Sequence, residues 1–379
     1  MANRTYSLEE VKTEASDFLN NKKKRNNTTY LNYRTSINYF IYYLEEVAEV
    51  NELGTSNKDK VLEGFQGSLL EGFNYKVEDN ERTVKVKASG VNTHIRRIKT
   101  FLNRNLGLTV EINKLDVGKP KYKSLSKEEV ELLIKESFYY WFLDKITFSK
   151  EDIEKIEAVL QEEGKYYLTI EELSELELTV PEIEKYKSNN EIAVRNSTLI
   201  RFLFNTAFRV NEALTLEVVN VYSEGSEYFV KIHEKGKAKG VLTEIAISET
   251  TYKMLLDYIA IKSVPSDFVF SSIKSSDNGK AKSFQRQEFN KAIIGLASYV
   301  DVKYKGTKIN GKSVNISKIV ENNSSHFLRH SKAVYLLNVK KEDVVTVQQI
   351  LRHNSIDSTL IYLNPQEQAI NLVRISNDI

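Results

Sequence analysis

Apolar side chains recur at helical spacing through most of this 379-residue chain, and only short stretches alternate as β-strands do. Tyr33–Leu44 and Val91–Leu102 carry apolar residues three and four positions apart, which places them on one face of a helix. Tyr228–Ile232 and Val241–Ile247 alternate instead, and the basic, glycine-containing segment Glu234–Gly240 joins them as a turn. The pattern predicts a mainly α fold with a small β-sheet, of the α+β class.

A break in this periodicity divides the chain. Val117–Ser124 contains glycine, proline and repeated lysine without apolar periodicity, which is typical of a linker. Ser126 then begins a helix whose first turn holds two glutamates, where the helix dipole favours acids. We therefore expect a helical domain over residues 1–118 and a second domain over residues 119–379.

Charge is distributed unevenly along the second domain. Phe148–Asn190 holds twelve Asp or Glu and five Lys, a net of −7, whereas the whole chain carries +2. The remainder therefore carries about +9, and local field rather than total charge decides whether a surface binds DNA. We expect residues 148–190 to form a folded acidic insertion. Beyond it, Asn196 or Ser197 is expected to cap the next helix. The lysine-rich segment Val302–Val320 is expected to form a hairpin.

The composition excludes several classes of protein. The chain has no cysteine, which rules out disulfides, thiol catalysis and cysteine-based zinc sites. Its first residues lack the apolar core of a secretory signal, and no apolar stretch is long enough to cross a membrane. We therefore expect a cytoplasmic protein without membrane association.

Four separated segments carry residues suited to exchanging a phosphodiester. Arginines at 209 and 329 stay charged and make forked contacts to the oxygens of an attacked phosphate. Lys235, in the hairpin turn, can give a proton to the leaving 5′-oxygen. Tyr362 offers an oxygen nucleophile that forms an ester, and imidazoles at 326 and 353 can help to move its proton. This chemistry requires no cofactor.

Each of these residues also has a structural explanation when taken alone, as a helix brace, a turn lysine or a half-buried aromatic. His326 and His330 lie four apart, a metal-ligand spacing, but no HExxH pattern accompanies them. We therefore expect no metal site. The order and spacing of the full set decide between the explanations.

The first half of that set resembles the tyrosine recombinase family, which includes phage integrases and Xer-type resolvases. Arg209 lies in the family's Arg-(Val or Ile)-x-Glu-x-Leu context, with Glu212 at an accessory acidic position. Lys235 comes next along the chain, in a hairpin similar to the family's Gly-Lys-Gly turn.

The second half completes the resemblance. His326 and Arg329 match the His-x-x-Arg motif, with His330 following as an accessory residue. His353 and then Tyr362 come after Arg329 at intervals that are typical of the family. One departure stands at Arg352, where the family usually has a glycine before the histidine.

The resemblance covers about residues 124–364, and residues 1–118 resemble the family's helical core-binding domain. It implies an enzyme that cuts and rejoins DNA through a 3′-phosphotyrosyl bond at Tyr362. It also implies a C-shaped clamp on duplex DNA with inverted-repeat sites. The family pattern further implies a monomer in isolation and a homotetramer on paired sites, with a C-terminal helix near Ala369–Val373 passed between protomers. On the same grounds, we expect the protein to be encoded by a mobile genetic element and to act with an accessory protein.

Basic residues beside the helical faces and in the hairpin turn are the expected DNA contacts. They are Lys22, Lys23, Lys24, Arg25, Arg96, Arg97, Lys99, Lys237 and Lys239. Three alternatives stay open on the sequence: a DNA-binding repressor that keeps the fold without recombining, a type IB topoisomerase acting as a monomer, and a metal-dependent hydrolase built on His326 and His330.

Overall fold

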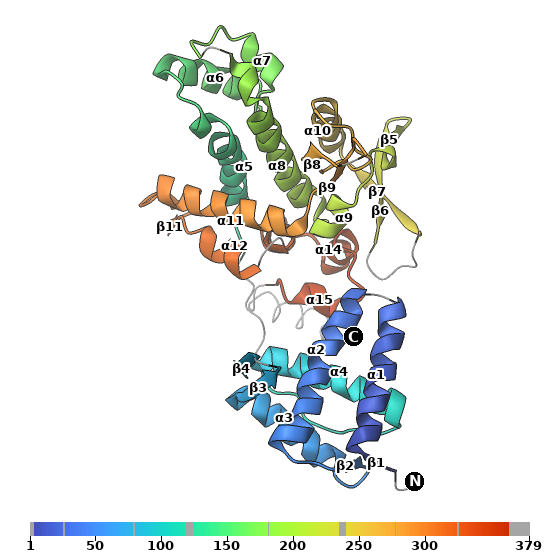
Figure 1. Ribbon diagram of the computed structural model, residues 1–379. Helices are drawn as coiled ribbons and strands as arrows, with labels where there is room; N and C mark the ends of the chain where they lie inside the picture. Colours follow the sequence, from blue (N-terminus) through green and yellow to red (C-terminus); the bar gives the residue numbers. More distant parts are fainter. Residues whose placement is uncertain are drawn as a thin grey trace, which may run out of the picture. The chain divides into compact units, whose positions relative to one another are not determined.

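The computed structural model describes residues 4–25, 27–78, 80–117, 124–180, 182–234, 240–276, 278–323 and 326–363. The chain divides into two compact units, an N-terminal unit (Met1–Pro120) and a C-terminal unit (Lys121–Ile379) (Figure 1). Helices dominate both, and the strands form small antiparallel sheets, so the predicted fold class is confirmed. Among the described residues, no helix combines the length and apolar character needed to span a membrane.

In its described part, the N-terminal unit packs four helices around one core. They are α1 (Leu8–Arg25), α2 (Asn27–Tyr42), α3 (Lys58–Glu71) and α4 (Ala88–Leu106). Phe40, Phe65 and Phe101 are fully buried at the centre of this core. Two antiparallel strand pairs that the sequence did not predict complete the unit, and the second of them is a hairpin. They pair β1 (Thr5–Ser7) with β2 (Glu52–Gly54), and β3 (Phe73–Val77) with β4 (Asn80–Val84).

The C-terminal unit is built on long helices that share a second core. They are α5 (Lys127–Trp141), α8 (Lys187–Thr206), α10 (Glu249–Ala260) and α11 (Arg286–Lys303). Shorter helices follow toward the C-terminus: α12 (Ser317–Asn323), α13 (Phe327–Val334), α14 (Val344–Leu351) and α15 (Asp357–Leu360). As predicted, Ser126 caps α5, since its hydroxyl accepts the Glu129 N–H while the Glu129 side chain accepts the Ser126 N–H.

A three-stranded antiparallel sheet flanks these helices. The predicted hairpin is present as β6 (Glu227–His233) and β7 (Leu242–Ile247), and β5 (Val221–Glu224) adds a third strand beside β6. A second pair joins β8 (Ser271–Ser275) to β9 (Ala281–Ser283). The expected lysine-rich hairpin is limited to β10 (Lys308–Ile309) and β11 (Lys312–Ser313), because α11 continues to Lys303.

The start of α8 was predicted wrongly. The sequence suggested a cap at Asn196 or Ser197, but α8 begins at Lys187 and runs for 20 residues. The reason is that polar residues in its first half are buried inside the unit. Asn190, for example, is 2% exposed and donates through Nδ2 to the Leu168 carbonyl at 2.8 Å. A polar run within a buried helix looks like a helix end in the sequence.

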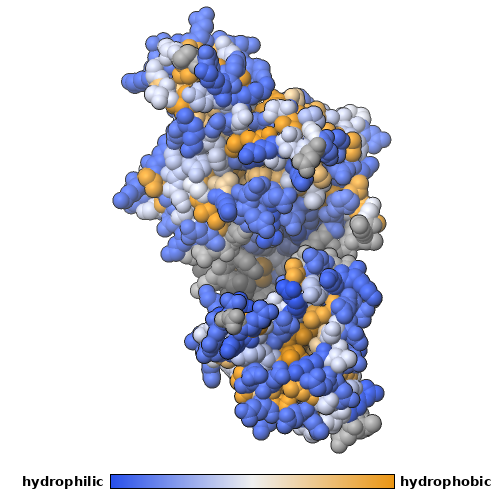
Figure 2. All heavy atoms as spheres, in the orientation of Figure 1, coloured by the Kyte–Doolittle hydropathy of each residue, from blue (hydrophilic) through white to orange (hydrophobic). Residues whose placement is uncertain are grey.

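The acidic segment folds as α6 (Lys150–Glu162), α7 (Ile170–Ser174) and the 3₁₀ turn η3 (Ile183–Tyr186). Its outer surface is mostly hydrophilic (Figure 2). Ile156, Leu168 and Leu173 nevertheless pack in the same core as α5 and α8. The segment adjoins the first residue of α8, and 20 helical residues span about 30 Å. The acidic segment therefore lies at the N-terminal end of α8, about 30 Å from the residues that follow its C-terminal end (Figure 1).

Leu173→Ala should lower the free energy of unfolding of the whole C-terminal unit by about 2–5 kcal/mol, because it opens a cavity in the shared core. Leu173 is 1% exposed. Chemical denaturation followed by tryptophan fluorescence measures the change, since Trp141 belongs to this core. Val219→Ala, at an 82% exposed position, is the matched control and should unfold like the wild type. An unchanged midpoint for Leu173→Ala would mean that the acidic segment folds independently.

Candidate active site

Arg209 lies in the turn that follows α8. Ala207 ends α8 with a left-handed φ of 53°, and Arg209 then caps α9 (Val210–Leu214). Glu212 accepts the Arg209 backbone N–H at 2.9 Å and pairs with Arg209 Nη1 at 2.7 Å. Burial raises the pKa of the Glu212 carboxyl, but the cations of Arg352 and Arg209 outweigh it and hold the pKa below its ordinary value. The carboxylate therefore stays ionised beside Arg209.

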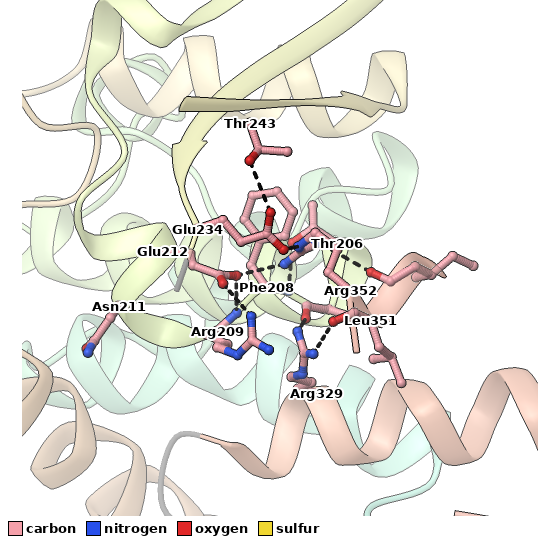
Figure 3. A network of polar contacts seen from close by, with 12 residues as sticks. Thr206, Phe208, Arg209, Asn211, Glu212, Glu234, Thr243, Arg329, Leu351 and Arg352 are labelled. Carbon is pink, nitrogen blue, oxygen red and sulfur yellow. Dashed lines mark hydrogen bonds and ion pairs between the residues drawn. The ribbon is translucent and has the colours of Figure 1, made fainter. Parts of the chain in front are cut away.

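Arg329 is buried on α13 and connects two distant turns (Figure 3). Its Nη1 donates to the Ala207 carbonyl at 2.7 Å, and its Nη2 donates to the Leu351 carbonyl at the end of α14. Burial, with the nearby cations of Arg209 and Arg352, lowers the pKa of Arg329 to about 10. The guanidinium therefore remains charged at neutral pH.

Tyr362 follows α15 and is 7% exposed. Its hydroxyl lies 2.6 Å from His330 Nδ1, and its ring lies 6.4 Å from the ring of His353 in a stacked arrangement. The Tyr362 carbonyl accepts a hydrogen bond from Asn338 Nδ2 at 3.0 Å. The phenol thus lies close to two imidazoles and is hydrogen-bonded to one of them.

The two imidazoles beside Tyr362 are neutral at pH 7. Burial, with help from nearby histidines and Arg329, lowers the pKa of His330 to about 4. Burial and the cations of Arg329, Arg209 and Arg352 lower the pKa of His353 to about 4 as well. His353 Nδ1 lies 2.9 Å from Thr359 Oγ1. A neutral His330 can accept the phenolic proton of Tyr362 at Nδ1.

His326 caps the start of α13, with its ring centroid 6.3 Å from that of His330. Lys235, Lys237 and Lys239 fall outside the described residues, as does the expected tail helix. Glu234, just before Lys235, is described: its Oε1 lies 3.9 Å from Arg352 Nε. Within the described ranges, no group of three or more His, Asp or Glu side chains is arranged to hold a metal ion.

The basic residues expected to contact DNA in the N-terminal unit lie on different faces. Arg97 donates to Ser36 Oγ on α2 at 3.2 Å, whereas Arg96 and Lys99 line a groove with Lys114 on another side of α4. On α1, Lys22, Lys23 and Lys24 lie near the C-terminal end, and the Lys22 ammonium sits 4.8 Å from the Tyr33 ring. The side chain of Arg25 is outside the described part of the structure.

Sequence reasoning underrated two residues. His330 was given an accessory place, yet its imidazole is the group in direct contact with the Tyr362 hydroxyl. Arg352 was noted only as a departure from a glycine position, yet its guanidinium pairs with Glu212. For Arg352, the sequence did carry a signal of a functional role, namely an arginine at a position that favours glycine.

Comparisons with known proteins agree on one family. Residues 175–369, just over half of the chain, match the model of the phage integrase family. The tyrosine recombinase XerH of Helicobacter pylori is 27% identical over 219 residues, which are 58% of this chain and 54% of XerH. A probable integrase/recombinase of Methanocaldococcus jannaschii is 25% identical over 319 residues, 78% of this chain and 86% of that protein. The chain spans about half the length of XerH and of a similar XerC from Rickettsia bellii.

Two solved structures share the fold. XerH bound to its difH substrate matches with a TM-score of 0.53 at 17% identity, covering 94% of this chain and 83% of that chain. The Tn1549 transposon integrase in complex with transposon right end DNA matches with a TM-score of 0.55 at 12% identity, covering 97% and 99%. At these identities the likeness is one of fold.

Acidification from pH 7 to pH 5 should destabilise the C-terminal unit through His330. An unfolded histidine titrates near 6.5, so below that pH the unfolded chain binds a proton that the folded chain, with a pKa of about 4, does not. The loss is at most about 2 kcal/mol per such histidine, and partial solvent exposure reduces it. Thermal unfolding at both pH values measures it.

His330→Gln should lose less stability on acidification than the wild type. The exposed His233 provides the control, because His233→Gln should keep the full pH dependence. Equal pH dependence in all three proteins would contradict the assignment of a neutral, buried His330.

Proposed function

The chain belongs to the phage integrase family of tyrosine recombinases, and from that premise we propose that it is a site-specific DNA recombinase. It cuts and rejoins strands through a 3′-phosphotyrosyl bond at Tyr362. The observation that carries the proposal is the convergence of two arginines and a histidine-bound tyrosine from α9, α13 and the segment after α15. These elements lie far apart in the sequence, so local folding alone does not assemble them.

The proposed reaction is a transesterification that conserves the phosphodiester energy. Tyr362 Oη attacks the phosphorus as its proton passes to His330, and the bond from phosphorus to the 5′-oxygen breaks. Lys235 supplies the proton that the leaving 5′-oxygen needs. Arg209 and Arg329 bind the non-bridging oxygens, where negative charge grows in the transition state. The incoming 5′-hydroxyl of a second strand reverses the step and frees the tyrosine.

The other catalytic assignments follow from position. His326 and His353 flank this centre and are proposed to donate to the phosphate or to assist proton movement. Glu212 orients Arg209. The scheme uses no metal or cofactor. We further propose double-stranded DNA with inverted-repeat sites as the substrate, held in a C-shaped clamp, with residues 1–118 as the core-binding domain and residues 119–379 as the catalytic domain.

Assembly is proposed by analogy with related structures. The structure of lambda integrase that shares this fold, at a TM-score of 0.52 and 10% identity, is a tetramer bound to a Holliday junction. We propose a monomer in isolation and a homotetramer on paired sites. The acidic surface of α6 and α7 is proposed to face away from DNA, because α8 separates it from Arg209 by about 30 Å.

We favour recombination over a repressor that never recombines, because the described site contains the proposed nucleophile Tyr362 and both proposed phosphate-binding arginines.

Tyr362→Phe should abolish covalent attachment to DNA while leaving single-site binding within about threefold, because only the phenolic oxygen is lost. A nicked duplex that traps the covalent intermediate provides the assay, with the product resolved by denaturing electrophoresis. Tyr299→Phe, on α11 and packed against the core that α5 and α8 share, is the matched control and should still attach. Attachment by Tyr362→Phe at the wild-type rate would identify another nucleophile.

Replacement of Lys235 by alanine should slow cleavage by about 10²-fold or more, because the leaving oxygen then lacks its proton donor. A DNA substrate with sulfur at the 5′-bridging position should restore the rate, since a thiolate leaves without protonation. Rates on the two substrates separate the roles: equal impairment on both would assign Lys235 to phosphate binding instead.

A further inference from the structure

Arg352 occupies a backbone conformation that favours glycine. It ends α14 with φ 53° and ψ 50°, in the left-handed region, where a side chain costs free energy that glycine avoids. Its N–H donates to the Gln349 carbonyl at 3.0 Å, so the turn is a regular helix end. A large side chain at such a position needs compensating contacts.

The Arg352 side chain makes those contacts inside the site (Figure 3). Nη2 lies 2.7 Å from Glu212 Oε2, and Nη1 donates to the Ile350 carbonyl at 3.2 Å. The guanidinium lies over the ring of Phe208, 4.5 Å from its centroid, and Nε lies 3.9 Å from Glu234 Oε1. The side chain is only 12% exposed.

Glu212 is therefore shared between two cations. Its Oε1 pairs with Arg209 Nη1, while its Oε2 accepts from Arg352 Nη2 and from the Arg209 backbone N–H. A carboxylate held from both sides has a fixed orientation and passes that orientation to Arg209. Because the carboxylate also pairs with Arg352, it neutralises less of the positive charge of Arg209 than it would if it paired with Arg209 alone.

The net charge of this described network determines how strongly it attracts an anionic substrate. Arg209, Arg329 and Arg352 carry three positive charges, and the carboxylates of Glu212 and Glu234 carry two negative charges. The net charge is +1 with Arg352 and zero without it. In a partly buried site, where charges are weakly screened, that difference acts directly on an anionic phosphate.

We propose that Arg352 is a positioning residue for phosphate binding. It holds Glu212, and through Glu212 it holds Arg209, and it keeps the site positive against the two carboxylates. It acts through its pairing with Glu212 and through the net charge of the site, without contacting the phosphate, because its guanidinium is largely buried against Phe208, Glu212 and a backbone carbonyl. The identity of the phosphate, a DNA phosphodiester, rests on the proposed function.

The first test is a double-mutant cycle on cleavage of the nicked duplex. Arg352→Gly suits the backbone and should fold, yet its cleavage rate should fall about 10- to 100-fold, with single-site binding within about threefold. Arg352→Lys should recover part of the rate by restoring the charge. In an Arg209→Ala background, Arg352→Gly should cost clearly less than in the wild type, because the positioning of Arg209 is lost already and only the change in net charge remains. A loss of equal size in both backgrounds would overturn the proposal.

The second test needs no DNA chemistry, so it separates this inference from the proposed function. The probe is inorganic phosphate, titrated calorimetrically into the full chain. Its Kd should rise about tenfold in Arg352→Gly and recover at least partly in Arg352→Lys. Lys341→Gly is the matched control: it has the same left-handed conformation and loses the same charge at an exposed position, and it should bind phosphate like the wild type.

The outcomes of the two tests are distinct. Absence of covalent attachment by the wild type would refute the proposed function and leave the phosphate titration to decide the role of Arg352. An unchanged phosphate Kd in Arg352→Gly, or no saturable phosphate binding by the wild type, would overturn the role proposed here.

Discussion

A buried guanidinium holds the site together. Arg329 is 5% exposed, and a charge so far from water is tolerated only where fixed dipoles replace the solvent. The two carbonyls that it binds, at Ala207 and Leu351, stand at the C-terminal ends of α8 and α14. Helix C-termini carry partial negative charge and unpaired carbonyls, so one cation satisfies two helix ends at once. The approach of these two ends is what brings the other site residues together.

Both helix ends then turn in the same way. Ala207 and Arg352 each adopt a left-handed conformation just after the helix, which reverses the chain within one residue. The first turn presents Arg209, and the second presents His353. Two similar local structures, joined by Arg329, therefore place an arginine and a histidine on the same site although they are distant in the sequence. The ion pair between Glu212 and Arg352 provides a second connection between the two turns.

The sequence predicts those features that are local or that follow a periodic pattern. The mainly helical fold, the β6–β7 hairpin and the Ser126 cap all follow from neighbouring residues. The pairing of Tyr362 with His330, and of Arg352 with Glu212, joins residues 32 and 140 positions apart, and no local pattern encodes such pairs. The prediction of where α8 starts was wrong for a related reason, because burial of its polar residues depends on the elements that pack around them.

The same cations that suit a phosphate also lower the proton affinity of the nearby histidines. Burial is the main cause of the lowered pKa of both His330 and His353; Arg329, Arg209 and Arg352 lower the pKa of His353 further, and Arg329 lowers that of His330 further. Without substrate, both imidazoles are therefore neutral and able to accept a proton. A phosphodiester placed on the arginines would cancel part of their positive field, and so raise the proton affinity of the imidazoles. In the proposed reaction, binding of the anion would therefore make His330 a better acceptor for the Tyr362 proton.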